Sequence, residues 1–291
     1  MNGSSHQEYR LRVGDAVIAL RGLGDEFAAS LATYFQRPSE IAAAHVQLTL
    51  EVHAVPPRDE IPSSLYATKQ RHPDGGFTAA DGLLRGSYDP GSGEGRLRIE
   101  DPLLEGRCVR VFEQILYQAY HSAVARGAPG GTLVHASGVA RQGAGYLFVG
   151  ASGRGKSTIA GLCADHLVLN DEIVLVQPDG DGRLVLRDTP FNGYFRTKQP
   201  GEAPLRAVFL LEHGPEHRVV LLPGAEAVAA LTTQVVPPIG LEAFLTNQIT
   251  VSMFHAAREI ADSVPVRSLE FRRDDGFWSA IDAHLAADGA A

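Results

Sequence analysis

The pattern G-x-x-x-x-G-K-[ST] is met at every fixed position by eight consecutive residues, Gly150-Ala151-Ser152-Gly153-Arg154-Gly155-Lys156-Ser157. Glycines in such a stretch let the backbone turn tightly and bring its N–H groups within reach of phosphate oxygens. The lysine would reach the β- and γ-phosphates of a nucleotide, and the serine hydroxyl would hold Mg²⁺. The pattern therefore predicts a phosphate loop for ATP and Mg²⁺. The predicted nucleotide-binding residues are Gly150, Ala151, Ser152, Gly153, Arg154, Gly155, Lys156, Ser157 and Thr158.

The segments on either side of this stretch are of the types that a phosphate loop requires. The apolar run Tyr146–Val149 can be the strand that leads in, and residues 157–164 can be the helix that leads out, whose N-terminus adds partial positive charge. The alternative is a glycine-rich turn that happens to precede a lysine. Upstream, the strand 133–140 and the turn 142–145 have hairpin spacing, so we expect antiparallel strands before the loop.

A nucleotide site needs acidic residues opposite the phosphate loop, which hold the metal and, in a kinase, accept the proton of the attacking hydroxyl. Asp171 and Glu172 are the candidates, because they lie between the apolar runs 167–169 and 173–176 and a solvated face explains them poorly. His135 lies in an apolar strand one hairpin upstream of the loop, so strand pairing would bring it close to the phosphates. On residue type alone, a satisfied core histidine is the preferred interpretation.

Composition and charge limit the class of protein. The chain has 291 residues, 44% of them hydrophobic and 21% charged, which is ordinary for a globular protein with a full core. A net charge of −8 argues against a nucleic-acid binder. Cys108 and Cys163 are expected to be buried, reduced thiols. The polar N-terminus and the lack of a long apolar run predict a cytoplasmic protein that does not enter a membrane.

The pattern along the chain predicts two domains, over residues 1–104 and 105–291. The first reads as a small antiparallel α+β unit, and its scattered histidines, His45, His53 and His72, favour no metal site. The elements expected there are strands at 9–12, 17–20, 46–52, 82–88 and 95–99, a helix at 27–35 and a loop at 56–76. The elements expected in the second are helices at 107–126, 225–231 and 241–260, strands at 167–169, 173–177, 183–187, 207–212 and 266–271, and a last helix containing Trp278.

From about residue 133 to residue 176 the chain resembles the catalytic domain of HPr kinase/phosphorylase, a bacterial serine kinase related in fold to ATP-dependent phosphoenolpyruvate carboxykinase. In that family a histidine begins a hairpin that ends in a G-x-S-G-x-G-K-S loop, and an acidic pair follows the helix of the loop. His135, the loop at 150–157 and the pair Asp171-Glu172 match this pattern, with glutamate in place of a second aspartate. The resemblance implies an α/β fold with mixed sheets around the phosphate loop.

The resemblance also implies roles for individual residues. The catalytic residues would be Asp171, His135 and Lys156, with Asp171 as general base or metal ligand. The Mg²⁺ ligands would come from Ser157, Asp171 and Glu172. The partner would be a peptide or protein that bears a serine, because similar relatives are associated with phosphorylating serine on peptides. The sequence does not decide whether the chain forms a homo-oligomer.

Arg196, Lys198 and Arg206 follow the segment Thr189–Gly193, which the fold relation would place near the site. A basic side chain there could stabilise charge on the transferring phosphoryl group, although solvated loop charges are an equal alternative. The residues together predict an ATP- and Mg²⁺-dependent kinase that acts on a hydroxyl, with serine of a peptide or protein as the expected acceptor. The alternatives are a small-molecule kinase or carboxykinase-like enzyme, and a nucleotide-binding regulatory protein without turnover.

Overall fold

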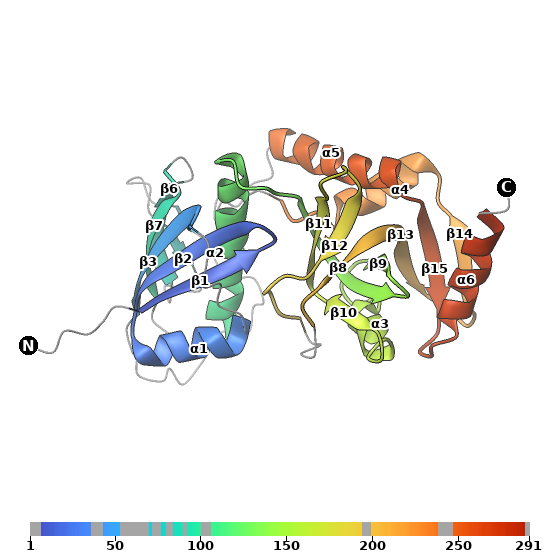
Figure 1. Ribbon diagram of the computed structural model, residues 1–291, viewed down its shortest axis with the longest axis horizontal. Helices are drawn as coiled ribbons and strands as arrows, with labels where there is room; N and C mark the ends of the chain where they lie inside the picture. The colour runs from blue at the N-terminus through green and yellow to red at the C-terminus, as the bar shows by residue number, and fades with distance from the viewer. Residues whose placement is uncertain are drawn as a thin grey trace, which may run out of the picture. The chain divides into compact units, whose positions relative to one another are not determined.

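The computed structural model describes residues 7–35, 43–52, 70–71, 77–79, 84–89, 92–99, 106–193, 199–237 and 247–288 (Figure 1). By its internal packing the chain divides into two units. The first comprises residues 1–130 and 238–246, and the second comprises residues 131–237 and 247–291. Among the helices within these described ranges, none has both the length and the apolar composition needed to cross a bilayer.

The first unit is a seven-stranded sheet with two helices, in the strand order β1-β2-β3-β7-β6-β5-β4. Strands predicted near 9–20, 46–52, 82–88 and 95–99 are confirmed, and β5 was not predicted. The loop expected at 56–76 contains the short strand β4, and its other residues lie outside the described part. The elements are β1 (Gln7–Val13), β2 (Ala16–Leu23), α1 (Asp25–Phe35), β3 (Val46–Val52), β4 (Gln70–Arg71), β5 (Phe77–Ala79), β6 (Leu84–Asp89), β7 (Glu94–Ile99) and α2 (Gly106–Ala125).

The prediction of an antiparallel sheet in this unit is wrong, because β3 runs parallel to both β2 and β7. The helix α1 follows β2 directly and returns the chain to the end of the sheet from which β2 began, so β3 must run in the same direction as β2. Phe27, Leu31 and Phe35, spaced four residues apart, form the buried side of α1.

The helix α2, predicted at 107–126, is confirmed, and it contacts β2, β3 and β6. By packing it therefore belongs to the first unit, whereas the sequence suggested that it begins the second. Phe112, Leu116 and Tyr120 are fully buried on its inner side. The domain boundary at 104/105 stays a prediction.

The second unit is organised on two long strands, β8 (Thr132–Arg141) and β13 (Glu202–His213), which each take part in two sheets. The first half of β8 pairs with β11, and its second half pairs with β9 and β10. The first residues of β13 pair with β12, and the following ones with β9 and β15. The remaining strands are β9 (Ala144–Val149), β10 (Leu167–Asn170), β11 (Ile173–Pro178), β12 (Leu184–Arg187), β14 (Arg218–Leu221) and β15 (Val266–Phe271).

Pairing closes five of these strands into a ring, β8-β11-β12-β13-β9, because β9 pairs with both β13 and β8. The predicted hairpin before the glycine-rich stretch is confirmed as β8–β9, and its two turn residues, Gln142 and Gly143, both have positive φ. The strands β9, β13 and β15 are mutually parallel, so their carboxyl ends lie at one edge. Glycine-rich residues 150–155 leave the sheet at that edge.

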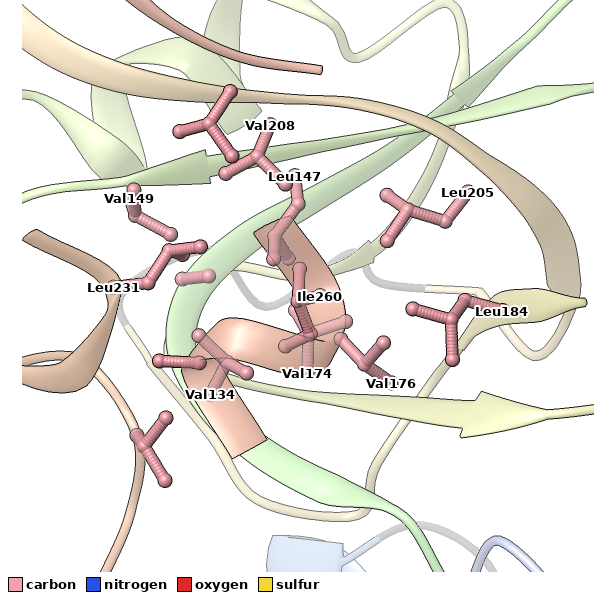
Figure 2. Close-up of a cluster of buried hydrophobic side chains, with 14 of the residues drawn as sticks. Val134, Leu147, Val149, Val174, Val176, Leu184, Leu205, Val208, Leu231 and Ile260 are labelled. Carbon is pink, nitrogen blue, oxygen red and sulfur yellow. The ribbon is translucent and has the colours of Figure 1, made fainter. Parts of the chain in front are cut away.

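Apolar side chains fill two cores in this unit, one on each face of the β9–β13 pair. Figure 2 shows the first, in which Ile260 of α5 lies beside Val174 of β11. The second joins α3 and α6 to the other face through Phe148, Phe209 and Trp278.

The strands and helices predicted for this unit are confirmed where the structure describes them. Strand β14 was not predicted, and residues 241–246 of the helix predicted at 241–260 lie outside the described part. The helices are α3 (Lys156–Leu162), α4 (Gly224–Thr232), α5 (Asn247–Ser263) and α6 (Phe277–Asp288).

Candidate functional site

The glycine-rich loop, residues 150–155, connects the end of β9 to the first turn of α3, in the order that the sequence predicts. Gly155 caps the helix with φ +100°, a left-handed conformation, and a Cβ added to it would lie 2.6 Å from the ring of Phe271. Both the backbone conformation and the close approach therefore require glycine at this position. Gly155 offers no side-chain cap to the first N–H groups of α3.

Lys156 lies beneath the loop instead of extending into solvent. Its side chain is buried, and Nζ donates to the carbonyl oxygen of Gly150 at 2.7 Å and to that of Ala151 at 3.4 Å. Burial lowers the pKa of Lys156, and the negative charges of Glu172 and Asp171 oppose this shift. The lysine and the two acids predicted to work together therefore lie within electrostatic range of each other.

The acidic pair lies at a bend between β10 and β11. The two side chains therefore do not have to point to opposite faces, as neighbours in one extended strand would. Asn170, fully buried, builds this bend: its Oδ1 accepts the N–H of Glu172 at 2.9 Å and that of Ile173 at 3.4 Å. Asp171 is 1% exposed, whereas the side chain of Glu172 is 24% exposed. The two acids therefore have different environments, and only Glu172 reaches solvent appreciably.

A second segment, Thr189–Gly193, packs on the acidic bend. The amide of Asn170 donates to the carbonyl oxygens of Thr189 at 3.1 Å and Phe191 at 2.8 Å, and the Thr189 hydroxyl donates to the carbonyl of Ile173 at 2.5 Å. Gly193 lies directly against Asp171, because a Cβ on Gly193 would overlap the Asp171 carboxylate. Asn170, Thr189 and Gly193 thus set the position of Asp171.

His135 lies on β8 opposite Ile173, and its Nε2 is 3.6 Å from Oε2 of Glu172. The backbone of His135 donates to the carbonyl of Gln234 at 2.8 Å, and the next N–H, of Ala136, donates to the carbonyl of Glu172 at 3.0 Å. The side chain of His135 is 36% exposed, so it is not the satisfied core histidine that its residue type suggested. It belongs instead to the cluster that contains Glu172.

Of the other predicted residues, Ser157 and Thr158 lie partly buried in the first turn of α3. Arg206 is exposed on β13 beside the beginning of β9, whereas the loop leaves from the end of β9, so of the two interpretations the structure favours a solvated charge for Arg206. Arg196 and Lys198 lie outside the described residues. Within the described part of the chain, no group of three or more His, Cys, Asp or Glu side chains is arranged to hold a metal ion.

The expected buried thiol is confirmed for Cys163, which follows α3. Its side chain is fully buried, and burial raises the pKa of Cys163 to about 12. A thiol with this pKa stays protonated at neutral pH, so Cys163 acts as a residue of the core against which α3 packs. The side chain of Cys108 lies outside the described residues.

Asn170, Thr189 and Gly193 were not predicted as site residues. A signal for Asn170 exists in its type and position, since an asparagine directly before a turn often accepts the N–H two residues on. The contacts of Asn170 with Thr189 and Phe191 join residues that are 19 and 21 positions apart in the sequence. Such contacts follow from the pairing of distant strands, so the local pattern does not predict them.

Comparison with solved structures finds a similarity to the Hpr(Ser) kinase/phosphatase from Coxiella burnetii. The sequence identity is 11%, and the match covers 54% of this chain and 93% of that chain with a TM-score of 0.30. This is a weak relation, and a TM-score this low does not establish a common fold or function. A comparison with curated proteins finds no match.

The model of one protein family matches residues 107–286, which is more than half of the 291 residues. The matched stretch runs from α2 into α6, and it contains the glycine-rich loop, the acidic bend at 171–172 and His135. The description of that family is SynChlorMet cassette protein ScmC. The chain therefore belongs to the ScmC family of SynChlorMet cassette proteins.

Proposed function

We propose that the protein is an ATP- and Mg²⁺-dependent phosphotransferase that transfers the γ-phosphoryl group to a hydroxyl, with serine of a peptide or protein as the acceptor. The observation that carries the proposal is the grouping of Lys156, beneath a glycine-rich loop with the G-x-x-x-x-G-K-[ST] pattern, with Asp171 and Glu172. A cation, a loop rich in backbone N–H groups and two carboxylates are the groups that phosphoryl transfer uses.

The residues present fit a nucleoside triphosphate with its metal ion. The amine of Lys156 donates to two loop carbonyl oxygens, at 2.7 and 3.4 Å, and its buried charge favours an anionic partner. The first turn of α3 carries N–H groups that no side chain caps. Oxygen ligands suit Mg²⁺, and Ser157 would supply a hydroxyl while Glu172 would supply a carboxylate. A bound Mg²⁺ would neutralise charge on the phosphates.

Asp171 is the proposed general base. A hydroxyl attacks phosphorus poorly unless its proton is accepted as the new bond forms, and a positioned base contributes about 10²–10⁴-fold to the rate. Asn170 builds the bend that carries Asp171, and Gly193 lies directly against its carboxylate, which restricts the orientation of the side chain as proton transfer needs. Glu172, more exposed and 3.6 Å from His135, would hold the metal or orient the histidine.

Replacing Gly193 with alanine is expected to lower turnover by about 10- to 100-fold. The added methyl group would displace the Asp171 carboxylate, and a displacement of about 1 Å can lower the rate of the chemical step by about 100-fold. Steady-state ATP consumption and ATP affinity should be measured together, and only the rate should fall. Gly180→Ala is the matched control, since no atom lies within 4 Å of its added Cβ. Equal rates for Gly193→Ala and the control would refute the positioning role.

The acceptor proposal rests on the resemblance to serine kinases, and a competition between acceptors tests it. The protein is incubated with Mg²⁺ and ATP labelled on the γ-phosphate, in parallel with a degenerate serine peptide pool and a pool of small hydroxyl compounds. Label on peptide serine, detected by mass spectrometry and lost in Asp171→Asn, supports the proposal. Label only on small molecules would assign a small-molecule kinase instead.

A further inference from the structure

His213, the last residue of β13, makes a contact with the glycine-rich loop that its place in the sequence does not suggest. Its Nε2 is 2.9 Å from the carbonyl oxygen of Gly153, which lies 60 positions earlier in the chain. A carbonyl oxygen only accepts, so Nε2 carries the hydrogen and donates it. The side chain is otherwise exposed, and it therefore contacts the loop from the solvent side of the sheet edge.

Phe271, the last residue of β15, supports the same loop from within the core. It is 1% exposed, and its ring approaches Gly155 so closely that a Cβ there would lie 2.6 Å away. The rings of His213 and Phe271 are 5.7 Å apart between centroids, at 33°. Because β13 and β15 are parallel with His213 opposite Phe271, the two rings stand side by side at the edge where the loop leaves.

We propose that His213 is a positioning residue for the nucleotide: its hydrogen bond to Gly153 holds the loop in the shape that receives phosphate. This inference rests on the proposed function of the loop. Gly153 has φ +81° and no atom within 4 Å of an added Cβ, so little packing restrains the loop at that residue. The hydrogen bond from His213 supplies a side-chain restraint on the loop at Gly153.

The expected effect follows from preorganisation. A loop that is already ordered pays less entropy when a ligand binds, so losing the restraint weakens binding without removing any atom that touches the ligand. One hydrogen bond of this kind contributes an effect of about three- to tenfold. His213 should therefore act on nucleotide affinity more than on the rate of the chemical step.

Two substitutions separate the N–H donor from the aromatic ring. His213→Phe keeps a ring against Phe271 and removes the donor, whereas His213→Gln keeps a donor at similar reach and removes the ring. We expect His213→Phe to raise the Kd for Mg-ATP by about three- to tenfold, and His213→Gln to stay near the wild-type value. Equal affinity of wild type and His213→Phe, or an equal loss in both variants, would overturn the inference.

A readout without nucleotide tests the loop directly. Arg154 is an exposed residue of the loop, so trypsin cleavage after Arg154 reports how often the loop opens, and cleavage after exposed Arg183, in the β11–β12 turn, reports on the remainder of the fold. His213→Phe should be cut about three- to tenfold faster at Arg154 and at an unchanged rate at Arg183. No change at Arg154 refutes the inference, and faster cleavage in a protein that binds no nucleotide refutes the proposed function alone.

Discussion

Replacing Lys156 with alanine is expected to weaken the binding of Mg-ATP by about 100-fold or more, because truncation of one partner of a buried charge pair costs this much. The Nζ atom lies beneath the loop at 2.7 Å from the Gly150 carbonyl oxygen. Isothermal titration calorimetry of the full chain measures the affinity for Mg-ATP, and circular dichroism checks that the variant folds.

The fold should survive this substitution. Burial lowers the pKa of Lys156, which means that the folded protein holds its charge at a cost, and alanine removes that cost together with the amine. Arg183→Ala is the matched control, since Arg183 is also a basic residue but is exposed in the β11–β12 turn, outside the loop. An unchanged affinity in Lys156→Ala would mean that the glycine-rich loop is not the nucleotide site.

Replacing Asp171 with asparagine should reduce turnover by about 10²–10⁴-fold while Mg-ATP still binds. Asparagine keeps the shape of the side chain against Gly193, and Asn170 still builds the bend, so the bend should be preserved while the proton acceptor is lost. The rate of ATP consumption and the affinity from calorimetry must be compared in the same preparation. A near wild-type rate would show that Asp171 is not the base.

Glu172→Gln is the decisive comparison for Asp171→Asn. The two acids are neighbours, yet Asp171 is 1% exposed and Glu172 lies 3.6 Å from His135 with a quarter of its side chain exposed. We expect Glu172→Gln to change the Mg²⁺ requirement more than the maximal rate. If only Glu172→Gln is inactive, the base is Glu172 and the register of the assignment is off by one residue.

The local pattern was sufficient to predict the hairpin, the strand–loop–helix order around residue 150 and the acid-bearing corner. Each depends on residues close in sequence: turn glycines, alternating or continuous apolar runs, and charged residues between two such runs. The grouping of Lys156, Asp171, Glu172 and His135 was also expected, although their chemical roles stay predictions.

The features that were missed depend on distant pairings. Closure of β8, β11, β12, β13 and β9 into a ring needs two long strands to change partners midway, and no local signal marks that point. The parallel pairing of β3 with β7 is missed for the same reason. The supports of the site, Asn170 on Phe191 and His213 on Gly153, follow from these pairings and could be identified only after folding.

The most direct test of the central claim is ATP consumption by the wild-type chain without an added acceptor. A phosphotransferase lets water replace the acceptor hydroxyl at a slow rate, whereas a protein that only binds nucleotide does not turn it over. We predict slow release of phosphate that requires Mg²⁺, stops when EDTA is added and is lost in Asp171→Asn. Saturable binding of Mg-ATP with no phosphate release above the Asp171→Asn background would contradict the account.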